Sequence, residues 1–230
     1  MTQLLEVLDY ETKASEYFGY PRPEMVPFVP ADCRRLLDVG CADGAFGEAL
    51  KKTREIEVWG VEPTKSAAAR ARMKLDRVVE GMFDPHVGLP TGSFDCVLFN
   101  DVLEHMVAPE VALRYARQLL APGGVVVASI PNIRSFPTIW RLVFHASWEY
   151  QDAGVLDRTH LRFFTKSSIV DMFEREGFAL EEISGINAFV AVPNIRRRFW
   201  LLYRLANALL FRKFDDMRFL QFAVVARLAA

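Results

Sequence analysis

The sequence predicts a doubly wound, Rossmann-like α/β fold, with helices on both faces of a seven-stranded, mostly parallel sheet. Apolar, strand-like runs alternate with helical patterns along the chain, as is typical of this architecture. Near the N-terminus, the apolar run 36–39 leads through a small-residue turn into a helical pattern. A strand, a tight turn and a helix in this order form the nucleotide pocket of doubly wound folds. The length of 230 residues fits one domain spanning residues 1–230.

The periodicity of apolar residues gives the expected elements in chain order. Strands are predicted at residues 36–39, 57–61, 78–79, 95–99, 125–130, 180–184 and 222–226. Helices are predicted at residues 45–52, 65–74, 110–120, 167–176 and 195–211. The segment Ala121-Pro122-Gly123-Gly124 ends one helix before the fifth strand, and Thr165 is the expected N-cap of another.

Two segments depart from the simple alternation, and a third closes the chain. Residues 1–30 form an N-terminal prefix, and residues 186–230 supply a C-terminal helix and strand. Residues 131–164 form a long, aromatic-rich insertion after the fifth strand. Ligands bind at the carboxyl edge of a parallel sheet, so we expect this insertion to be a lid and a wall of the substrate site. Its aromatic faces suit sugar rings, although aromatic residues also fill cores.

Composition and charge limit the classes of partner. The chain is 51% hydrophobic with a net charge of −1, which argues against a nucleic-acid partner. Three cysteines without a CxxC pair argue against a disulfide framework or a zinc knuckle. Residues 1–16 do not resemble a signal peptide, so we expect a cytoplasmic protein without stable membrane insertion. The basic run 196–198 precedes an apolar stretch that suits a buried helix, a homodimer face or peripheral membrane contact, so monomer and homodimer both stay open.

The small-residue turn distinguishes between nucleotides. Counting from Gly40, Ala42 and Ala45 stand where a dinucleotide fingerprint has its second and third glycines, which disfavours NAD. The remaining pattern, D-x-G-x-A-x-G, resembles the first motif of class I S-adenosylmethionine-dependent methyltransferases. An alanine at position 42 is a mild departure if its φ is negative. The resemblance implies a cofactor site at the turn, with Asp38 facing the cationic end and with backbone contacts from Gly40, Cys41, Ala42 and Gly44, where a helix N-terminus offers N–H groups.

Other expected cofactor contacts follow along the chain. Glu62, about 20 residues beyond the turn, has the spacing of a carboxylate that binds both ribose hydroxyls, and Pro63 follows it. The resemblance places Met82 and Phe83 at the adenine ring; Met82 stands where related enzymes often have an aspartate. It places Asn100 and Asp101 at the methionine moiety. It places Tyr17 and Arg22 over the cofactor, where Arg22 is expected to pair with the cofactor carboxylate.

A narrower resemblance extends over about residues 15–178. Segments 20–25, 89–105, 129–132 and 154–165 resemble bacterial methyltransferases associated with O-antigen and polysaccharide biosynthesis. This resemblance implies O-methylation of a sugar or another glycan-related small molecule. N- or C-methylation of another metabolite and a non-catalytic cofactor-binding module stay open as alternatives.

Two histidines stand at motif positions that face the expected site. A sugar hydroxyl is a poor nucleophile, so a nearby base helps, and His105 and His160 are the candidates for catalysis. The set Asp101, Glu104, His105 and His160 also resembles the magnesium site of small-RNA 2′-O-methyltransferases. The same Leu-Glu-His sequence is common in metal-free relatives, where the glutamate opens a helix. The sequence alone therefore assigns no metal.

Overall fold

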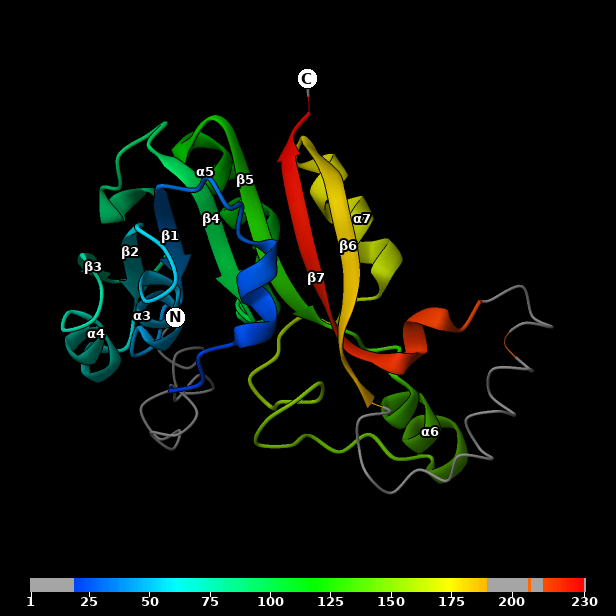
Figure 1. Ribbon diagram of the computed structural model, residues 1–230. Helices are drawn as coiled ribbons and strands as arrows, with labels where there is room; N and C mark the ends of the chain where they lie inside the picture. The colour runs from blue at the N-terminus through cyan, green and yellow to red at the C-terminus, as the bar shows by residue number, and fades with distance from the viewer. Residues whose placement is uncertain (1–18, 190–206, 208–212, 230) are drawn as a thin grey trace.

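The computed structural model describes residues 19–189, residue 207 and residues 213–229, and it contains the predicted seven-stranded sheet. The strand order is β3-β2-β1-β4-β5-β7-β6 (Figure 1). The strands are β1 (Arg35–Val39), β2 (Glu57–Glu62), β3 (Arg77–Glu80), β4 (Phe94–Asn100), β5 (Leu120–Pro131), β6 (Phe178–Ala188) and β7 (Phe219–Leu228). β7 runs antiparallel to β5 and β6, and the other neighbouring pairs are parallel. The predicted fold class is confirmed.

The helices follow the predicted positions with one addition. They are α3 (Ala45–Lys51), α4 (Lys65–Ala71), α5 (Pro109–Leu119), α6 (Phe136–His145) and α7 (Lys166–Arg175). Short 3-10 helices are η2 (Pro23–Phe28), η3 (Pro85–Val87), η4 (Leu103–His105) and η6 (Asp215–Arg218). Thr165 forms a capping box with Ser168 at the start of α7, which confirms the predicted cap. α6 lies within the insertion 131–164, and the predicted helix 195–211 falls outside the described residues except for residue 207.

Alternating side chains of the central strands supply two apolar cores, one on each face of the sheet. Leu37 of β1 belongs to the core that α5 and α7 cover, whereas Leu36 belongs to the core that α3, α4 and η2 cover. β4 divides in the same way, with Phe99 in the first core and Leu98 in the second. Both faces of the sheet are therefore covered, and the ends of the strands are left for ligand binding.

The register places three strand ends at the same edge of the sheet. Val39 of β1 lies opposite Val61 of β2 and Phe99 of β4. The loops that follow these strands therefore leave the sheet side by side. Asn100 at the end of β4 pairs with Ser129 of β5, so the insertion that follows β5 starts from this edge as well. These connections bring the expected cofactor residues and the insertion together.

Candidate functional site

The turn after β1 needs glycine at two positions. Gly40 has a φ of +68°, and a Cβ there would lie 2.8 Å from Cγ2 of Val102. Gly44, which precedes α3, has a φ of +80°. Ala42 also has a positive φ, +51°, so the condition under which an alanine here is a mild departure, a negative φ, is not met. Because the left-handed conformation costs a residue with a Cβ roughly 1–2 kcal/mol, Ala42 is strained.

The N–H groups of the same turn are engaged within the chain. Gly40 and Cys41 both donate to the carbonyl of Val61, at 2.8 and 3.2 Å. Ala42 donates to Oε2 of Glu62 at 2.9 Å. The expectation that the turn offers unoccupied N–H groups is therefore not met at these three positions. The assignment of the turn to the cofactor site stays a prediction.

Glu62 at the end of β2 is buried, and hydrogen bonds hold both of its carboxylate oxygens. Oε1 accepts the N–H of Thr64 at 2.8 Å, and Oε2 accepts that of Ala42. Each oxygen keeps a lone pair for a second donor. Asp38 is buried in the same region, and burial together with the charge of Glu62 raises the pKa of Asp38 to about 8. The turn thus places two acidic side chains next to the expected cofactor edge.

Three more predicted cofactor residues have different surroundings. The Cys41 side chain is buried, and a Cβ on Gly60 would lie only 2.4 Å from its Sγ, so this thiol is part of the core. Phe83 packs against Phe99 and Tyr115, with ring centroids 5.6 and 4.9 Å apart. Met82 is 61% exposed. The predicted adenine contacts of Met82 and Phe83 stay predictions.

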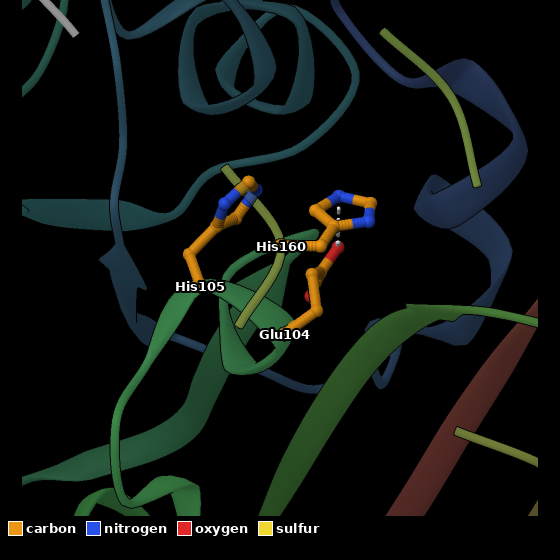
Figure 2. Close-up of side chains that lie close together, drawn as sticks. All are labelled: Glu104, His105 and His160. Carbon is orange, nitrogen blue, oxygen red and sulfur yellow. Dashed lines mark ion pairs between the residues drawn. The ribbon is translucent and has the colours of Figure 1, made fainter. Parts of the chain in front are cut away.

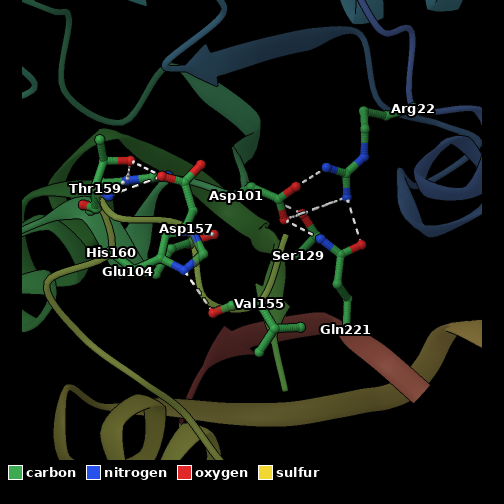
Figure 3. A network of polar contacts seen from close by, with 10 residues as sticks. Arg22, Asp101, Glu104, Ser129, Val155, Asp157, Thr159, His160 and Gln221 are labelled. Atoms are coloured by element: carbon green, nitrogen blue, oxygen red, sulfur yellow. Dashed lines mark hydrogen bonds and ion pairs between the residues drawn. The ribbon is translucent and has the colours of Figure 1, made fainter. Parts of the chain in front are cut away.

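Asp101, directly after β4, lies at the centre of a polar network (Figure 3). The Arg22 guanidinium forms an ion pair with its carboxylate, and Ser129 Oγ and Gln221 Nε2 donate to Oδ1 at 2.7 and 2.9 Å. The predicted pairing of Arg22 with a cofactor carboxylate stays a prediction, because the structure places this guanidinium on Asp101. Tyr17 lies outside the described residues.

Asn100, the last residue of β4, has a buried side-chain amide. Its Oδ1 and Nδ2 have no hydrogen-bond partner among the described residues. Buried polar groups in folded proteins are nearly always paired. Asn100 is therefore an unsatisfied group at the edge where the sequence predicts the methionine moiety.

Glu104, His105 and His160 form a compact cluster, although 55 residues separate the two histidines (Figure 2). Glu104 and His105 belong to η4, and His160 comes from the insertion. The N–H groups of Leu161 and Arg162 donate to the carbonyl of Glu104 at 2.8 and 3.0 Å, which fixes the insertion to η4. One ligand-type atom from each of the three side chains lies within 4.8 Å of the other two. The structure thus brings both predicted catalytic histidines together.

Backbone carbonyl groups orient both histidine rings. His105 Nδ1 lies 3.1 Å from the carbonyl of Thr159, and His160 Nδ1 lies 3.1 Å from that of Val155. A carbonyl only accepts, so these contacts favour the tautomer with the proton on Nδ1 and the lone pair on Nε2. Asp157 Oδ1 accepts from the Thr159 N–H and hydroxyl at 2.9 and 2.7 Å. Asp157 therefore fixes the residue that orients His105.

The Glu104 carboxyl group is fully buried, and neither oxygen has a hydrogen-bond partner among the described residues. Its Oε1 lies 3.9 Å from Nε2 of His160, too far for a hydrogen bond. Burial raises the pKa of Glu104 to about 8; the residue's own nearby backbone N–H and the charge of Arg22 oppose this effect, and the charge of Asp157 adds to it. The cluster therefore contains a buried carboxyl group that its protein surroundings leave unsatisfied.

A cavity of about 290 Å³ opens beside this cluster. It is bounded by the end of β4, the insertion and the start of β7, and its described lining residues are Asp101, Glu104, His105, Pro131, Gly154, Val155, Asp157, His160, Asn187, Leu220 and Gln221. The insertion thus forms one wall of this cavity, and its role as a lid and substrate wall stays a prediction. No Phe, Tyr or Trp belongs to this described lining, so the expected aromatic stacking surface is not found here.

Some functional residues were missed in the sequence. Asp157 and Thr159 lie in a segment that was singled out, but their role in orienting His105 depends on a fold of the insertion that no local pattern indicates. Gln221 reaches Asp101 from β7, 120 residues along the chain. Its apolar strand neighbours gave no sign that it faces the site.

Among the described residues, every helix is too short or too polar to span a membrane.

The comparison with protein families gives one match over most of the chain. The profile described as a methyltransferase domain covers residues 9–183. This range contains the glycine turn, Glu62 and the cluster of Glu104, His105 and His160. It ends before β7.

Curated relatives and solved structures agree with this match. The ubiquinone biosynthesis O-methyltransferase of Psychrobacter arcticus is 30% identical over 183 residues, which cover 73% of this chain and 66% of the relative. The enzyme with the same name from Aeromonas salmonicida is 26% identical over 160 residues, which cover 67% of this chain. The chain therefore spans 66% of the length of both relatives, slightly less than two thirds. Neither name refers to polysaccharides.

Among solved structures, the chain is similar to a SAM-dependent methyltransferase from Archaeoglobus fulgidus, where SAM is S-adenosylmethionine. The TM-score is 0.66, and the match covers 98% of this chain and 99% of that one. The sequence identity is 18%, so this similarity supports the fold alone.

Proposed function

This chain belongs to the methyltransferase-domain family, with S-adenosylmethionine as methyl donor, and we propose that it methylates a hydroxyl oxygen of a small-molecule acceptor. The observation that carries this proposal is the position of Glu104, His105 and His160. They line a cavity next to the carboxyl end of β4, the edge at which this fold holds its cofactor. Groups that can accept a proton or stabilise its positive charge therefore lie where the acceptor would enter.

The residues of the turn and the strand ends fit S-adenosylmethionine. Gly40 leaves a space against Val102 that any Cβ would fill. The Glu62 carboxylate keeps lone pairs for two ribose hydroxyls while Thr64 and Ala42 hold it in place. The buried amide of Asn100, which has no hydrogen-bond partner among the described residues, supplies both a donor and an acceptor for the carboxylate and ammonium groups of the methionine moiety. The bound cofactor supplies a methyl group on a positively charged sulfur.

The acceptor hydroxyl must lose one proton during methyl transfer. The acceptor oxygen bonds to the methyl carbon as the bond from sulfur to that carbon breaks, and the hydroxyl proton leaves. A hydroxyl is a weak nucleophile at neutral pH, so a group that promotes loss of this proton accelerates transfer. With Nδ1 bound to a carbonyl, His105 and His160 each present Nε2 for this task. The cavity also positions the acceptor, which is the larger part of the work in an in-line displacement.

We propose a hydroxyl-rich acceptor with one ring-sized unit in the cavity, and a sugar is one such acceptor. The volume of about 290 Å³ is at the small end of ligand pockets. Carboxylates and amides of Asp157, Asn187 and Gln221 offer hydrogen-bond partners for several hydroxyls. The names of the two O-methyltransferase relatives support oxygen as the methylated atom. The absence of aromatic rings from the described lining removes stacking as support for a sugar.

Methyl transfer to a panel of acceptors tests this proposal. Purified protein is incubated with S-adenosylmethionine that carries a labelled methyl group and with one of four acceptor classes. These are monosaccharides, catechols, primary amines and molecules with a nucleophilic carbon atom. We expect labelled methyl ethers from the first two classes. His160→Gln should abolish transfer, whereas His86→Gln, which changes an exposed histidine in η3, should not. Transfer only to amines or carbon would contradict the proposal, as would cofactor binding without transfer to any class.

A further inference from the structure

We propose that Glu104, His105 and His160 bind a divalent transition-metal ion, which in turn binds the acceptor hydroxyl in the adjoining cavity. This inference rests on the proposed function and deepens it. Three observations carry it: the distances between the ligand-type atoms, the orientation of the two imidazole rings, and a buried carboxyl group with no hydrogen-bond partner among the described residues.

The distances between the three ligand atoms suit one metal ion after a small movement of the side chains. The three ligand atoms lie within 4.8 Å of one another. A metal ion about 2.1 Å from each ligand in a tetrahedral arrangement places the ligands about 3.4 Å apart. The ligands must therefore move together by roughly 1 Å. Glu104 can make this movement by side-chain rotation, because no described residue forms a hydrogen bond with its carboxyl group.

The imidazole rings are already oriented as metal ligands are. A histidine that binds a metal through one nitrogen almost always donates from the other to a carbonyl or carboxylate. His105 Nδ1 has the Thr159 carbonyl as its partner, and His160 Nδ1 has that of Val155. The ring centroids are 4.7 Å apart with planes inclined by 69°, so the rings converge without stacking (Figure 2). Thr159 is in turn fixed by Asp157, which makes Asp157 and Thr159 positioning residues (Figure 3).

Glu104 is the observation that points to a cation. A fully buried carboxylate is expected to be paired with a positive charge or held by several donors. Glu104 has neither within hydrogen-bond distance, while its backbone carbonyl is bonded by the N–H groups of Leu161 and Arg162. The backbone therefore holds the side chain in a place where no described residue is within hydrogen-bond distance of its oxygens. A divalent ion supplies the missing partner.

Asp101 does not complete this site, in contrast to the four-residue set that the sequence suggested. Its carboxylate is occupied by Arg22, Ser129 and Gln221, and it is not a member of the cluster. Two imidazoles and one carboxylate favour Mn²⁺, Fe²⁺, Co²⁺ or Zn²⁺ over Mg²⁺ and Ca²⁺, which prefer oxygen ligands. Three protein ligands leave coordination positions open on the side of the cavity.

The ion would change the chemistry of the acceptor. An oxygen bound to a divalent cation loses its proton at a lower pH than in water, so the hydroxyl binds as the alkoxide or phenolate and its proton passes to solvent. The new bond from oxygen to the methyl carbon then forms as the bond from sulfur breaks, leaving a methyl ether and the thioether product. Both Nε2 atoms bind the ion in this scheme, so neither histidine accepts the proton itself. Two neighbouring hydroxyls would fill two open positions, which favours a diol or a catechol.

Metal binding is tested by calorimetry on the full chain, without any acceptor. The protein is treated with a chelator, dialysed, and titrated with Mn²⁺ and with Zn²⁺; Co²⁺ absorption in the visible range reports the ligand set. We expect one ion per chain. Glu104→Gln and His160→Gln should each weaken binding by more than the roughly 10–100-fold that loss of an outer partner costs. Thr159→Val keeps the carbonyl at His105 Nδ1 and removes only the hydroxyl that lies 3.2 Å from the same nitrogen and bonds to Asp157, so it should weaken binding by at most about 10-fold.

Two controls separate the site from unspecific binding. His86→Gln and Asp152→Asn change an exposed histidine and an exposed carboxylate, and both should bind the ion like the wild type. Binding of S-adenosylmethionine by each variant, measured in the same cell, shows that the variant is folded.

The outcomes distinguish the metal site from the proposed function. If the wild type takes up neither ion, or if Glu104→Gln takes up as much as the wild type, the metal site is wrong. If metal-free protein methylates hydroxyl acceptors at the full rate, the ion has no role while the proposed function stands. If the ion binds but no hydroxyl acceptor is methylated, the proposed function fails while the metal site stands.

Discussion

Two buried glutamates at the same edge of the sheet have opposite surroundings. Glu62, at the end of β2, has a backbone N–H bonded to each carboxylate oxygen. Glu104, in η4 after β4, has no hydrogen bond to either oxygen among the described residues. Both side chains are less than 5% exposed, so burial does not explain the difference.

The different hydrogen bonding of the two carboxyl groups suits two different functions. A carboxylate with fixed donors is preorganised, and it keeps its position whether or not a ligand is bound. A buried carboxyl group without hydrogen-bond donors lowers the stability of the folded protein, and a bound ligand that supplies the missing partner offsets this loss. We therefore propose that Glu62 belongs to a permanent cofactor platform and Glu104 to the reacting side of the site.

The largest expected effect is on turnover. Glu104→Gln keeps the shape of the side chain and removes its charge. We expect kcat/KM for the acceptor identified in the panel to fall about 10²–10⁴-fold, the usual contribution of a group that promotes proton transfer. Steady-state rates with the wild type and His86→Gln as references measure it. A loss of less than about threefold, smaller than this range by more than a decade, would remove Glu104 from the reaction.

The next effect is on stability, where the two glutamates should differ in sign. Glu62→Gln loses charge-assisted hydrogen bonds to two backbone N–H groups, and the free energy of unfolding should fall by about 1.5–3 kcal/mol. Glu104→Gln removes an unpaired buried carboxyl group, and its free energy of unfolding should stay the same or rise in metal-free protein. Urea denaturation of both variants at one pH makes the comparison. Equal destabilisation by the two substitutions would mean that Glu104 has a partner of its own.

The pH dependence of stability tests the electrostatics of the turn. The pKa of Asp38 is raised from 3.8 to about 8 by burial and by Glu62. Between these values the unfolded state has released the proton that the folded state keeps, so the stability that Asp38 contributes is present below pH 4 and is lost as the pH rises to 8. The slope from this one group is at most about 1.4 kcal/mol per pH unit.

Asp38→Asn should remove that slope. Urea denaturation of the wild type and the variant from pH 5 to pH 8 gives the two curves, and their difference isolates Asp38 from Glu104, whose pKa is also raised to about 8. We expect the variant to gain stability relative to the wild type as the pH rises. Parallel curves would show that Asp38 is ionised in the folded protein over this range.

The smallest effect concerns the strained alanine of the turn. Ala42→Gly relieves a φ of +51°, and we expect stabilisation of about 1 kcal/mol, or a rise in Tm of about 2–4 °C. The matched control is Ala69→Gly, an exposed position in α4, which should lower stability by about 1 kcal/mol because glycine weakens a helix. Differential scanning calorimetry measures both. Equal losses in the two variants would contradict the strain at position 42.

Much of the fold could be predicted because its causes are local. Strand runs such as 36–39 and the cap at Thr165 depend on residues close in sequence, and both were found. α6 was missed because the insertion was interpreted from its aromatic residues rather than from helical spacing. The left-handed conformation of Ala42 was not predicted, because a turn needing three left-handed positions is not visible from residue type alone.

The site could be predicted only in part. The pattern identified His105 and His160, and the structure brings them together, but their position beside Glu104 depends on backbone hydrogen bonds from Leu161 and Arg162. The pairing of Arg22 with Asp101 joins residues 79 apart, a contact that neither segment indicates. Such long-range contacts are set by the tertiary fold, which local sequence does not encode.

The assignment of the two glutamates is tested most directly by calorimetric titration of S-adenosylmethionine into the wild type, Glu62→Gln and Glu104→Gln. We predict that Glu62→Gln raises Kd about 10–100-fold, as expected for the loss of charge-assisted hydrogen bonds to the ribose. Glu104→Gln should leave Kd within about twofold, less than 0.5 kcal/mol. The reverse result, weak binding in Glu104→Gln with normal binding in Glu62→Gln, would contradict the division of the site into a cofactor platform and a reacting side.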